Sequence, residues 1–348
     1  MRFYTGQHRY YCGIDLHART MYLCILDHES GKTVLQRNLR CEPERFLRAI
    51  EPYRADLVVG AECIFCWYWL ADLCMQEDIP FVLGHALYMK AIHGGKAKND
   101  KIDAHKIAVL LRGGAFPVAY VYPRGMRATR DLLRRRLLFV RRRSELFTHI
   151  RIVFHQLNLP APAGRLREPR SRVGLLEAIP DAVVRANVEA DLALAERLDD
   201  IIRSLELTIR RQAKVDDPKT LRLLKTIPGV GRILALTLLY ELHDIDRFPR
   251  VGDFLSYARL VKSQKASAGR VTGTSGAKIG NAHLKWAYSE AAVLFLQKNP
   301  RAQRLISRLR SKHGKSKALS ILAARLGRAS YFMLRRATAF DMERFVLN

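Results

Sequence analysis

The chain has 348 residues, enough for two or three domains that each bury a core, and its formal net charge is +27. This charge, from 60 lysines and arginines against 33 aspartates and glutamates, favours a polyanionic partner and above all nucleic acid. No apolar run is long enough to span a bilayer and no signal peptide opens the chain, so we exclude a membrane protein and expect a cytoplasmic, nucleoid-associated one.

The first predicted element is a strand over Tyr11–His17, followed by a tight reversal and a second strand over Met21–Asp27. Asp15 lies in the middle of this hairpin, where a carboxylate is costly to bury unless it is paired or binds a metal. On this segment alone, a solvated or hydrogen-bonded aspartate near the end of a strand is an alternative explanation.

Strands and helices then alternate along the chain. We predict strands over Thr33–Leu39, Asp56–Glu62 and Pro80–Leu83, with helices over Glu42–Tyr53 and Phe65–Gln76. This order is typical of an α/β RNase H-like domain, in which an antiparallel part of the sheet continues into a parallel part and ligands lie at the C-terminal ends of strands. On that layout Asp15 lies beside Glu62, at the end of the fourth strand.

The six cysteines all fall in the first quarter of the chain. Cys63 and Cys66 form a single C-x-x-C without a second pair or a suitably spaced histidine. Zinc binding or redox chemistry is therefore a weaker interpretation than buried free thiols.

Two further acids, Asp100 and Asp103, stand three residues apart at the start of a helix predicted over Ala104–Leu111, so they face the same way. A helix N-terminus favours anions, so both could also be capping residues. With Asp15 and Glu62 they complete a D-E-D-x-x-D set. Four carboxylates in one cleft of so basic a protein predict one or two Mg²⁺ (or Mn²⁺) ions that polarise a phosphodiester.

The segments Gly13–His17, Ala61–Glu62 and Lys98–Ala104 resemble the amino-terminal domain of the DEDD insertion-sequence transposases. The resemblance implies a RuvC-like nuclease domain and DNA recombination guided by a structured bridge RNA. A Gly-Ile-Asp hairpin also opens actin-fold sugar kinases, but those need a glycine and a small hydroxylic residue directly after the aspartate. Here Leu16 and His17 follow Asp15, which argues against a kinase.

A long arginine-rich helix is predicted over Tyr122–Arg151, and a second helix over Arg172–Lys214 has apolar residues at coiled-coil spacing. The loop Leu157–Pro169 is proline-rich, so the two helices would form an antiparallel coiled-coil arm. The alternative is a plain helical hairpin packed on its own domain. As an arm, this region would form a homodimer or a dimer of dimers and hold nucleic-acid phosphates with two arginine triplets. The triplets are Arg134, Arg135, Arg136 and Arg141, Arg142, Arg143.

The segment Leu221–Glu241 predicts a helix, a glycine hairpin and a second helix. Gly229 and Gly231 let the chain turn and bring bare backbone N–H groups to a phosphate oxygen. The sequence Ile-Pro-Gly-Val-Gly is typical of a helix-hairpin-helix, which grips the nucleic-acid backbone without reading its sequence. An ordinary interhelical turn is the alternative. The carboxy-terminal domain of the transposase family contains the same helix-hairpin-helix.

The segment Leu260–Asn281 is small, polar, glycine-rich and basic, and by itself it predicts a flexible loop between helices. It resembles the serine patch of the same transposases, in which a serine attacks DNA. The resemblance places that nucleophile at Ser267, with Ser263 and Ser275 as alternatives.

This segment also departs from the family pattern at Lys262, Ala266 and Ala268, which replace a proline, a serine and a glycine. A serine hydroxyl needs activation by a base or a metal. Nearby cations would neutralise the charge of the attacked phosphate. These cations are Lys265, Arg270 and Lys278.

Helices predicted over Ala282–Gln297, Pro300–His313 and Lys315–Thr338 complete the chain. The prediction is therefore a RuvC-like α/β domain at 1–122, a coiled-coil arm at 123–217 and an all-α transposase domain at 218–348.

The predicted function is that of a transposase that cuts and rejoins donor and target DNA with a guide RNA as partner. Metal-bound carboxylates would orient the scissile phosphate, and Ser267 would attack it to leave a covalent phosphoserine. One alternative is a RuvC-like junction-resolving endonuclease in which metal-activated water attacks. Another is a non-catalytic nucleic-acid-packaging protein, which would have no use for four acids.

Overall fold

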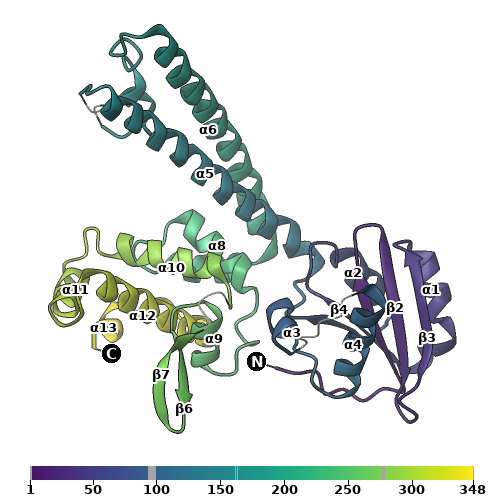
Figure 1. The fold of residues 1–348 in the computed structure, drawn as a ribbon. Helices are drawn as coiled ribbons and strands as arrows, with labels where there is room; N and C mark the ends of the chain where they lie inside the picture. Colours follow the sequence, from purple (N-terminus) through teal and green to yellow (C-terminus); the bar gives the residue numbers. More distant parts are fainter. Residues whose placement is uncertain (1, 93–98, 161, 163, 276–278, 348) are drawn as a thin grey trace. The chain divides into compact units, whose positions relative to one another are not determined.

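The computed structural model describes residues 2–92, 99–160, 162, 164–275 and 279–347. The chain divides into two compact units, Met1–Arg124 and Gly125–Asn348 (Figure 1). The second unit contains both the predicted arm and the predicted C-terminal domain. Among the described residues, no helix is both long enough and apolar enough to cross a membrane.

The first unit is built on a five-stranded sheet with the strand order β3-β2-β1-β4-β5. The strands are β1 (Tyr10–Leu16), β2 (Thr20–Asp27), β3 (Thr33–Arg40), β4 (Leu57–Glu62) and β5 (Phe81–Gly84). β1 pairs with β2 and β2 with β3 in antiparallel fashion, whereas β4 runs parallel to β1 and β5 parallel to β4. The α/β class and the mixed sheet predicted for this unit are confirmed, and both are consistent with an RNase H-like fold.

Helices cover both faces of this sheet, so β1 is buried on both sides. They are α1 (Pro43–Ile50), the 3₁₀ helix η1 (Glu51–Asp56), α2 (Tyr68–Gln76), α3 (Ala86–Ile92) and α4 (Asp100–Arg112). On one face Cys12 and Ile14 pack with Phe46 of α1. On the other, a Cβ at Gly13 would lie 2.2 Å from the carbonyl oxygen of Ala104. Only glycine at this position therefore lets α4 pack directly against β1.

The end of α1 and the start of α4 differ from the prediction for local reasons. The α1 helix ends at Ile50 and continues as 3₁₀ turns, because Pro52 cannot donate a helical hydrogen bond. The α4 helix begins at Asp100 rather than Ala104, because the Asn99 side chain caps it and accepts the Ile102 N–H at 2.8 Å.

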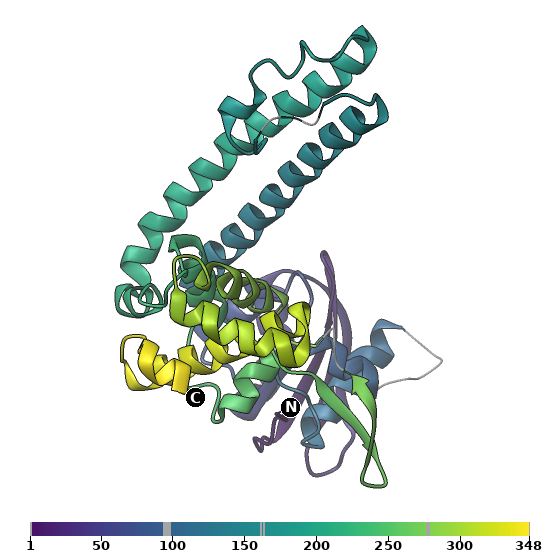
Figure 2. The same cartoon turned by 90° about the vertical axis from the view of Figure 1, so that its left-hand side faces the viewer.

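In the second unit, α5 (Arg124–Gln156) and α6 (Ala182–Asp216) run antiparallel and side by side (Figures 1 and 2). Phe147 and Ile150 of α5 are buried in one cluster with Val188 and Leu192 of α6. The coiled-coil geometry of this pair stays a prediction.

The α6 helix begins at Ala182, whereas the sequence predicts a start at Arg172. Asp181 caps it, because its carboxylate accepts the N–H groups of Val183 and Val184 at 2.8 and 2.9 Å. A short 3₁₀ helix, η2 (Pro169–Arg172), precedes α6 in the chain.

The rest of the second unit consists of seven helices and one β-hairpin within the described part of the chain. These are α7 (Pro218–Leu224), α8 (Arg232–Leu242), α9 (Val251–Tyr257), β6 (Ser263–Ser267), β7 (Arg270–Ser275), α10 (Ala282–Phe295), α11 (Pro300–His313), α12 (Lys315–Arg336) and α13 (Met342–Leu347). Tyr240, Phe254, Tyr288 and Phe295 are fully buried in the core that α8, α9 and α10 share with α12.

The β-hairpin corrects two expectations, the flexible loop over Leu260–Asn281 and the all-α class of this region. Ala268 and Gly269 both adopt positive φ, 48° and 76°, as in a type I′ turn between twisted strands. β-Branched residues such as Val271 and Thr272 follow in β7 and favour the extended conformation. A short turn signal was thus hidden in a stretch whose composition indicates a loop.

Candidate catalytic site and nucleic-acid interface

The acidic site forms where α4 begins, at the C-terminal end of β1. Asp15 shares the sheet face of Gly13, and this face is the one that α4 covers. His17 Nε2 lies 3.4 Å from Asp15 Oδ2 and 3.5 Å from Asp100 Oδ1. One ligand atom from each of Asp15, His17 and Asp100 lies within 4.8 Å of the others. The structure therefore brings together two of the four predicted acids and adds a histidine between them.

The electrostatics of Asp15 are those of a partly buried carboxylate among like charges. Burial is the main cause that raises the pKa of Asp15 above its ordinary value. The charge and hydrogen bond of His17 lower this pKa, and the charges of Asp100 and Asp103 raise it. Asp103 therefore lies close enough to act on Asp15, and its own carboxylate contacts Lys106 Nζ at 3.4 Å. A divalent cation would relieve the repulsion among these acids.

Glu62 is placed by the register of the sheet. Ile14 of β1 pairs with Ala61 of the parallel strand β4, so Asp15 and Glu62 occupy the next positions of two adjacent strands. Glu62 also shares a face with Gly60, where an added Cβ would lie 2.5 Å from Leu111 of α4. Glu62 therefore belongs to the sheet face of Asp15, although it is not one of the three residues grouped above.

The donor set fits a hard divalent cation, because carboxylate oxygens are the ligands that Mg²⁺ and Mn²⁺ prefer in proteins. His17 is not among the predicted site residues. Its signal in the sequence is the Asp-Leu-His spacing, which brings two side chains two residues apart in an extended chain to the same face. The role of each site residue stays a prediction.

Ser267, the predicted nucleophile, is the last residue of β6 and is exposed. It pairs in register with Arg270, the exposed first residue of β7, across the turn. Backbone register places Ser263 opposite Ser275 at the other end of the hairpin, and Lys265 opposite Gly273. Lys278 lies outside the described residues. Ser267 and the acids belong to different units of the chain.

The arginine triplets of α5 make ion pairs inside the second unit. Arg134 Nε donates to Glu241 at 2.6 Å and Arg136 Nη2 to Glu206 at 2.6 Å. Further pairs join Arg142 to Glu145 and Arg143 to Asp199. Arg135 and Arg141 are exposed. These two arginines are therefore the members of the triplets best placed to reach a phosphate.

Glu241 is a buried acid to which the sequence gives no clue. Its side chain is 2 % exposed, and it accepts hydrogen bonds from Arg130 at 3.0 Å, from Arg134 and from Asn281 Nδ2 at 2.8 Å. Burial alone would raise the pKa of Glu241. The hydrogen bond from Arg134, the charges of both arginines and the hydrogen bond from Asn281 outweigh burial and lower this pKa from 4.5 to about 2. Glu241 thus ties α5, α8 and the start of α10 together.

The two glycines of the predicted helix-hairpin-helix differ in what surrounds them. Gly229 has a φ of +79°, and a Cβ there would lie 2.5 Å from the backbone nitrogen of Phe295 in α10. Gly231 caps the N-terminus of α8 and has open space where a Cβ would stand. Gly229 is therefore required for helix packing, whereas the surroundings of Gly231 leave room for a phosphate near the first N–H groups of α8. The nucleic-acid role of this turn stays a prediction.

Two family models match the chain. One, described as the Transposase IS116/IS110/IS902 family, matches residues 221–307, and the other, a DEDD model of the IS110 group described as a transposase, matches residues 12–158. The chain is also similar to a transposase for insertion sequence element IS1111A from Coxiella burnetii (strain RSA 493 / Nine Mile phase I). The two are 24% identical over 277 residues, which is 78% of this chain and 74% of that relative. The match over residues 12–158 contains all four predicted acids, and the match over residues 221–307 contains Ser267.

Proposed function

We propose that this chain, which belongs to the IS110 family of insertion-sequence transposases, cuts and rejoins DNA with the acids around Asp15 and with Ser267 as nucleophile. The observation that carries the proposal is the meeting of Asp15, His17 and Asp100 at the end of β1. A packaging protein needs only positive charge, and a set of clustered acids would weaken its hold on phosphates.

Asp15 and Asp100 would hold Mg²⁺ or Mn²⁺, with Glu62 and Asp103 on the same side of the sheet. The ion would supply Lewis-acid polarisation of a phosphodiester oxygen. His17 contacts both acids and positions them, and α4 fixes their spacing because its packing on Gly13 is close.

Ser267 would form a bond from its Oγ to phosphorus while the bond from phosphorus to the oxygen of the leaving strand breaks. The hydroxyl proton is lost to a base or to solvent, and the leaving oxygen takes up a proton. An exposed residue at the tip of a hairpin suits this role, because a narrow two-stranded element reaches a phosphodiester without steric conflict. Arg270, its cross-strand partner, would neutralise phosphate charge.

The remaining partners follow from charge and family. The formal charge of +27 and the exposed Arg135 and Arg141 on α5 support contact with the phosphates of donor DNA, target DNA and a guide RNA. The pair α5 and α6 would be the arm through which the protein forms a homodimer or a dimer of dimers.

The test is a strand-cleavage assay on labelled donor DNA in Mg²⁺, run with denaturing gels that also reveal covalent protein–DNA adducts. Asp15→Asn should abolish cleavage, whereas Asp78→Asn, an exposed acid of the same unit, should leave it unchanged. Ser267→Ala should retain DNA binding and lose the adduct, with Ser289→Ala on α10 as its matched control.

Wild-type cleavage by Asp15→Asn would overturn the carboxylate site. A covalent adduct that still forms in Ser267→Ala would mean that another serine, Ser263 or Ser275, is the nucleophile. Cleavage by the wild type without any adduct would instead support a nuclease that uses metal-activated water.

A further inference from the structure

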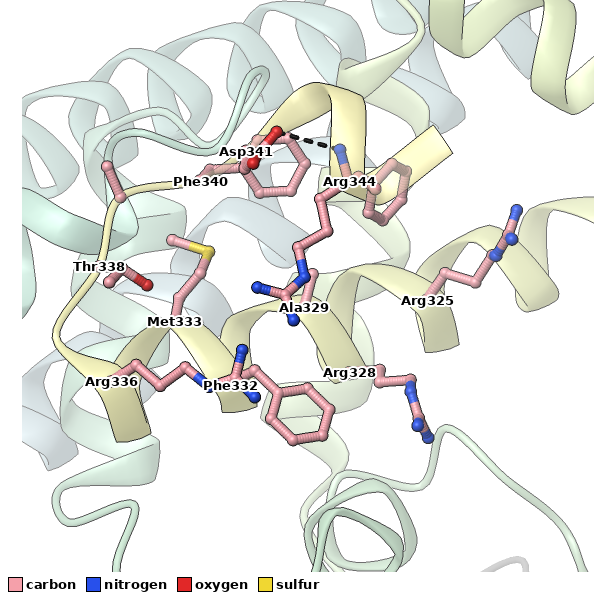
Figure 3. Close-up of a pocket in the computed structure, with 12 residues that line it drawn as sticks. Arg325, Arg328, Ala329, Phe332, Met333, Arg336, Thr338, Phe340, Asp341 and Arg344 are labelled. Carbon is pink, nitrogen blue, oxygen red and sulfur yellow. Dashed lines mark hydrogen bonds between the residues drawn. The ribbon is translucent and has the colours of Figure 1, made fainter. Parts of the chain in front are cut away.

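A pocket of about 640 Å³ lies between α12 and α13 in the second unit (Figure 3). Its lining combines two kinds of side chain. Arginines come from both helices, as Arg325, Arg328 and Arg336 of α12 and Arg344 of α13. Apolar groups, including Phe332 and Phe340, supply the rest of the surface. The volume lies within the range of small-ligand sites.

The arginines are arranged around an aromatic ring. Arg328 Cζ lies 5.4 Å and Arg336 Cζ 5.2 Å from the centroid of Phe332. A guanidinium that packs over a ring keeps its in-plane N–H donors available for a phosphate fork. In Figure 3 the side chains of Arg336 and Arg344 reach from opposite helices into the same space.

The one acid of the pocket lining, Asp341, is engaged by the backbone of α13. The Asp341 carboxylate accepts the backbone N–H groups of Glu343 at 2.9 Å and Arg344 at 3.0 Å, and so caps α13. Four arginines against this single aspartate leave the lining strongly positive. An anion with more than one charged group would balance it.

The apolar side of the pocket is built from aromatic rings. Phe340 packs against Phe345 with ring centroids 5.3 Å apart and against Phe295 at 5.8 Å. Phe295 and Phe345 are buried, so they anchor Phe340, which is partly exposed at the pocket. A flat ring that enters the pocket would therefore find both aromatic rings and guanidinium planes to stack against.

We propose that this pocket binds an unstacked nucleotide of a single-stranded nucleic acid, with the base among the phenylalanines and the flanking phosphates on the arginines. Inorganic phosphate has no group for the aromatic side. A duplex keeps its base faces stacked and cannot present one to the pocket. Four arginines exceed the charge of one phosphodiester, which favours a strand with successive phosphates over a free mononucleotide.

This site is separate from the acids and from Ser267, so its test needs no cleavage. Full-length protein is titrated, in EDTA, into fluorescent oligouridylate, into oligothymidylate of equal length and into a duplex, and binding is measured by fluorescence polarisation at several salt concentrations. Arg328→Gln with Arg336→Gln is the pocket variant. Arg308→Gln with Arg310→Gln, on exposed positions of α11, removes the same charge outside the pocket.

We expect the pocket variant to bind single strands about tenfold more weakly, with a log-log salt slope smaller by about 1.4 for two lost contacts. The α11 control should change much less, and duplex binding should change equally in both variants. Phe332→Leu, which keeps the charges, should weaken single-strand binding about fivefold or more. The ratio of the affinities for oligouridylate and oligothymidylate tells whether the pocket prefers RNA or DNA.

Photo-crosslinking of an oligomer that contains 5-iodouridine supplies a readout that does not depend on any variant. Crosslinked peptides should come from Leu326–Arg344. Crosslinks that map only to other segments would overturn the proposal. Equal loss of single-strand binding in the pocket variant and in the α11 control would overturn it as well, because net charge would then explain the effect.

Discussion

Replacing Glu241 by glutamine should loosen the helices that meet at this residue. Glutamine keeps the size of the side chain, but it replaces one acceptor oxygen with an N–H donor and removes the charge that Arg130 and Arg134 face. The difference between a pKa of 4.5 in the unfolded chain and about 2 in the folded one corresponds to about 3 kcal/mol. Breaking a buried ion pair by removing one partner costs a similar amount, about 3–5 kcal/mol.

The assay is hydrogen–deuterium exchange read by mass spectrometry, which follows α8 and α10 separately from the rest of the chain. At neutral pH, a loss of about 3 kcal/mol should lower the protection of these helices about a hundredfold in Glu241→Gln. Glu290→Gln, on an exposed position of α10, is the control and should exchange like the wild type.

The pH dependence of exchange follows from the sign of the pKa shift. Because folding lowers the pKa of Glu241, its contribution to stability is complete above about pH 4.5 and is lost as the pH falls towards 2. The wild type should therefore lose protection of α8 in this interval, after correction for intrinsic exchange, and the variant should lose less. Wild-type protection in Glu241→Gln at neutral pH would show that the charge of Glu241 does not stabilise α8 and α10.

Three other experiments test separate parts of the structure. Asp103→Ala should abolish strand cleavage in a gel assay while filter binding of DNA persists or rises slightly, since removing an acid strengthens non-specific attraction; normal cleavage would remove Asp103 from the site. Arg135→Gln with Arg141→Gln should lower the log-log salt slope of duplex binding by up to about 0.9 per lost contact. An unchanged slope would mean that these two arginines are solvated and contact no phosphate. Gly229→Ala should lower the melting temperature by several degrees, because its Cβ would meet the backbone of α10, whereas Gly231→Ala should melt close to the wild type. Equal melting of the two glycine variants would contradict the packing role of Gly229.

Elements whose signals are local could be predicted from the sequence. Alternating and continuous apolar runs predict the five strands, and the structure confirms their order in the α/β sheet. Parallel pairing of β1 with β4 follows from that order, and it explains why Asp15 and Glu62 could be predicted as neighbours. The segments Gly13–His17, Ala61–Glu62 and Lys98–Ala104 together indicate the transposase family, and the family models that match residues 12–158 and 221–307 support it.

The pairing of side chains far apart in the sequence depends on tertiary packing. Arg134 and Arg136 look like phosphate ligands in the sequence, yet their acids, Glu241 and Glu206, lie 107 and 70 residues away. No local pattern records such a pairing, because the burial that makes it necessary exists only once α5 packs against α6 and α8.

The same reason explains His17 and the hairpin of β6 and β7. His17 joins the acidic site because α4, about a hundred residues into the chain, packs on Gly13 and brings Asp100 to it. The turn at Ala268 and Gly269 is a local signal, but the polar composition around it is equally compatible with a loop. Periodicity fixes which face of an element is buried, whereas the partner it is buried against, and the charges that must then be paired, are properties of the folded chain.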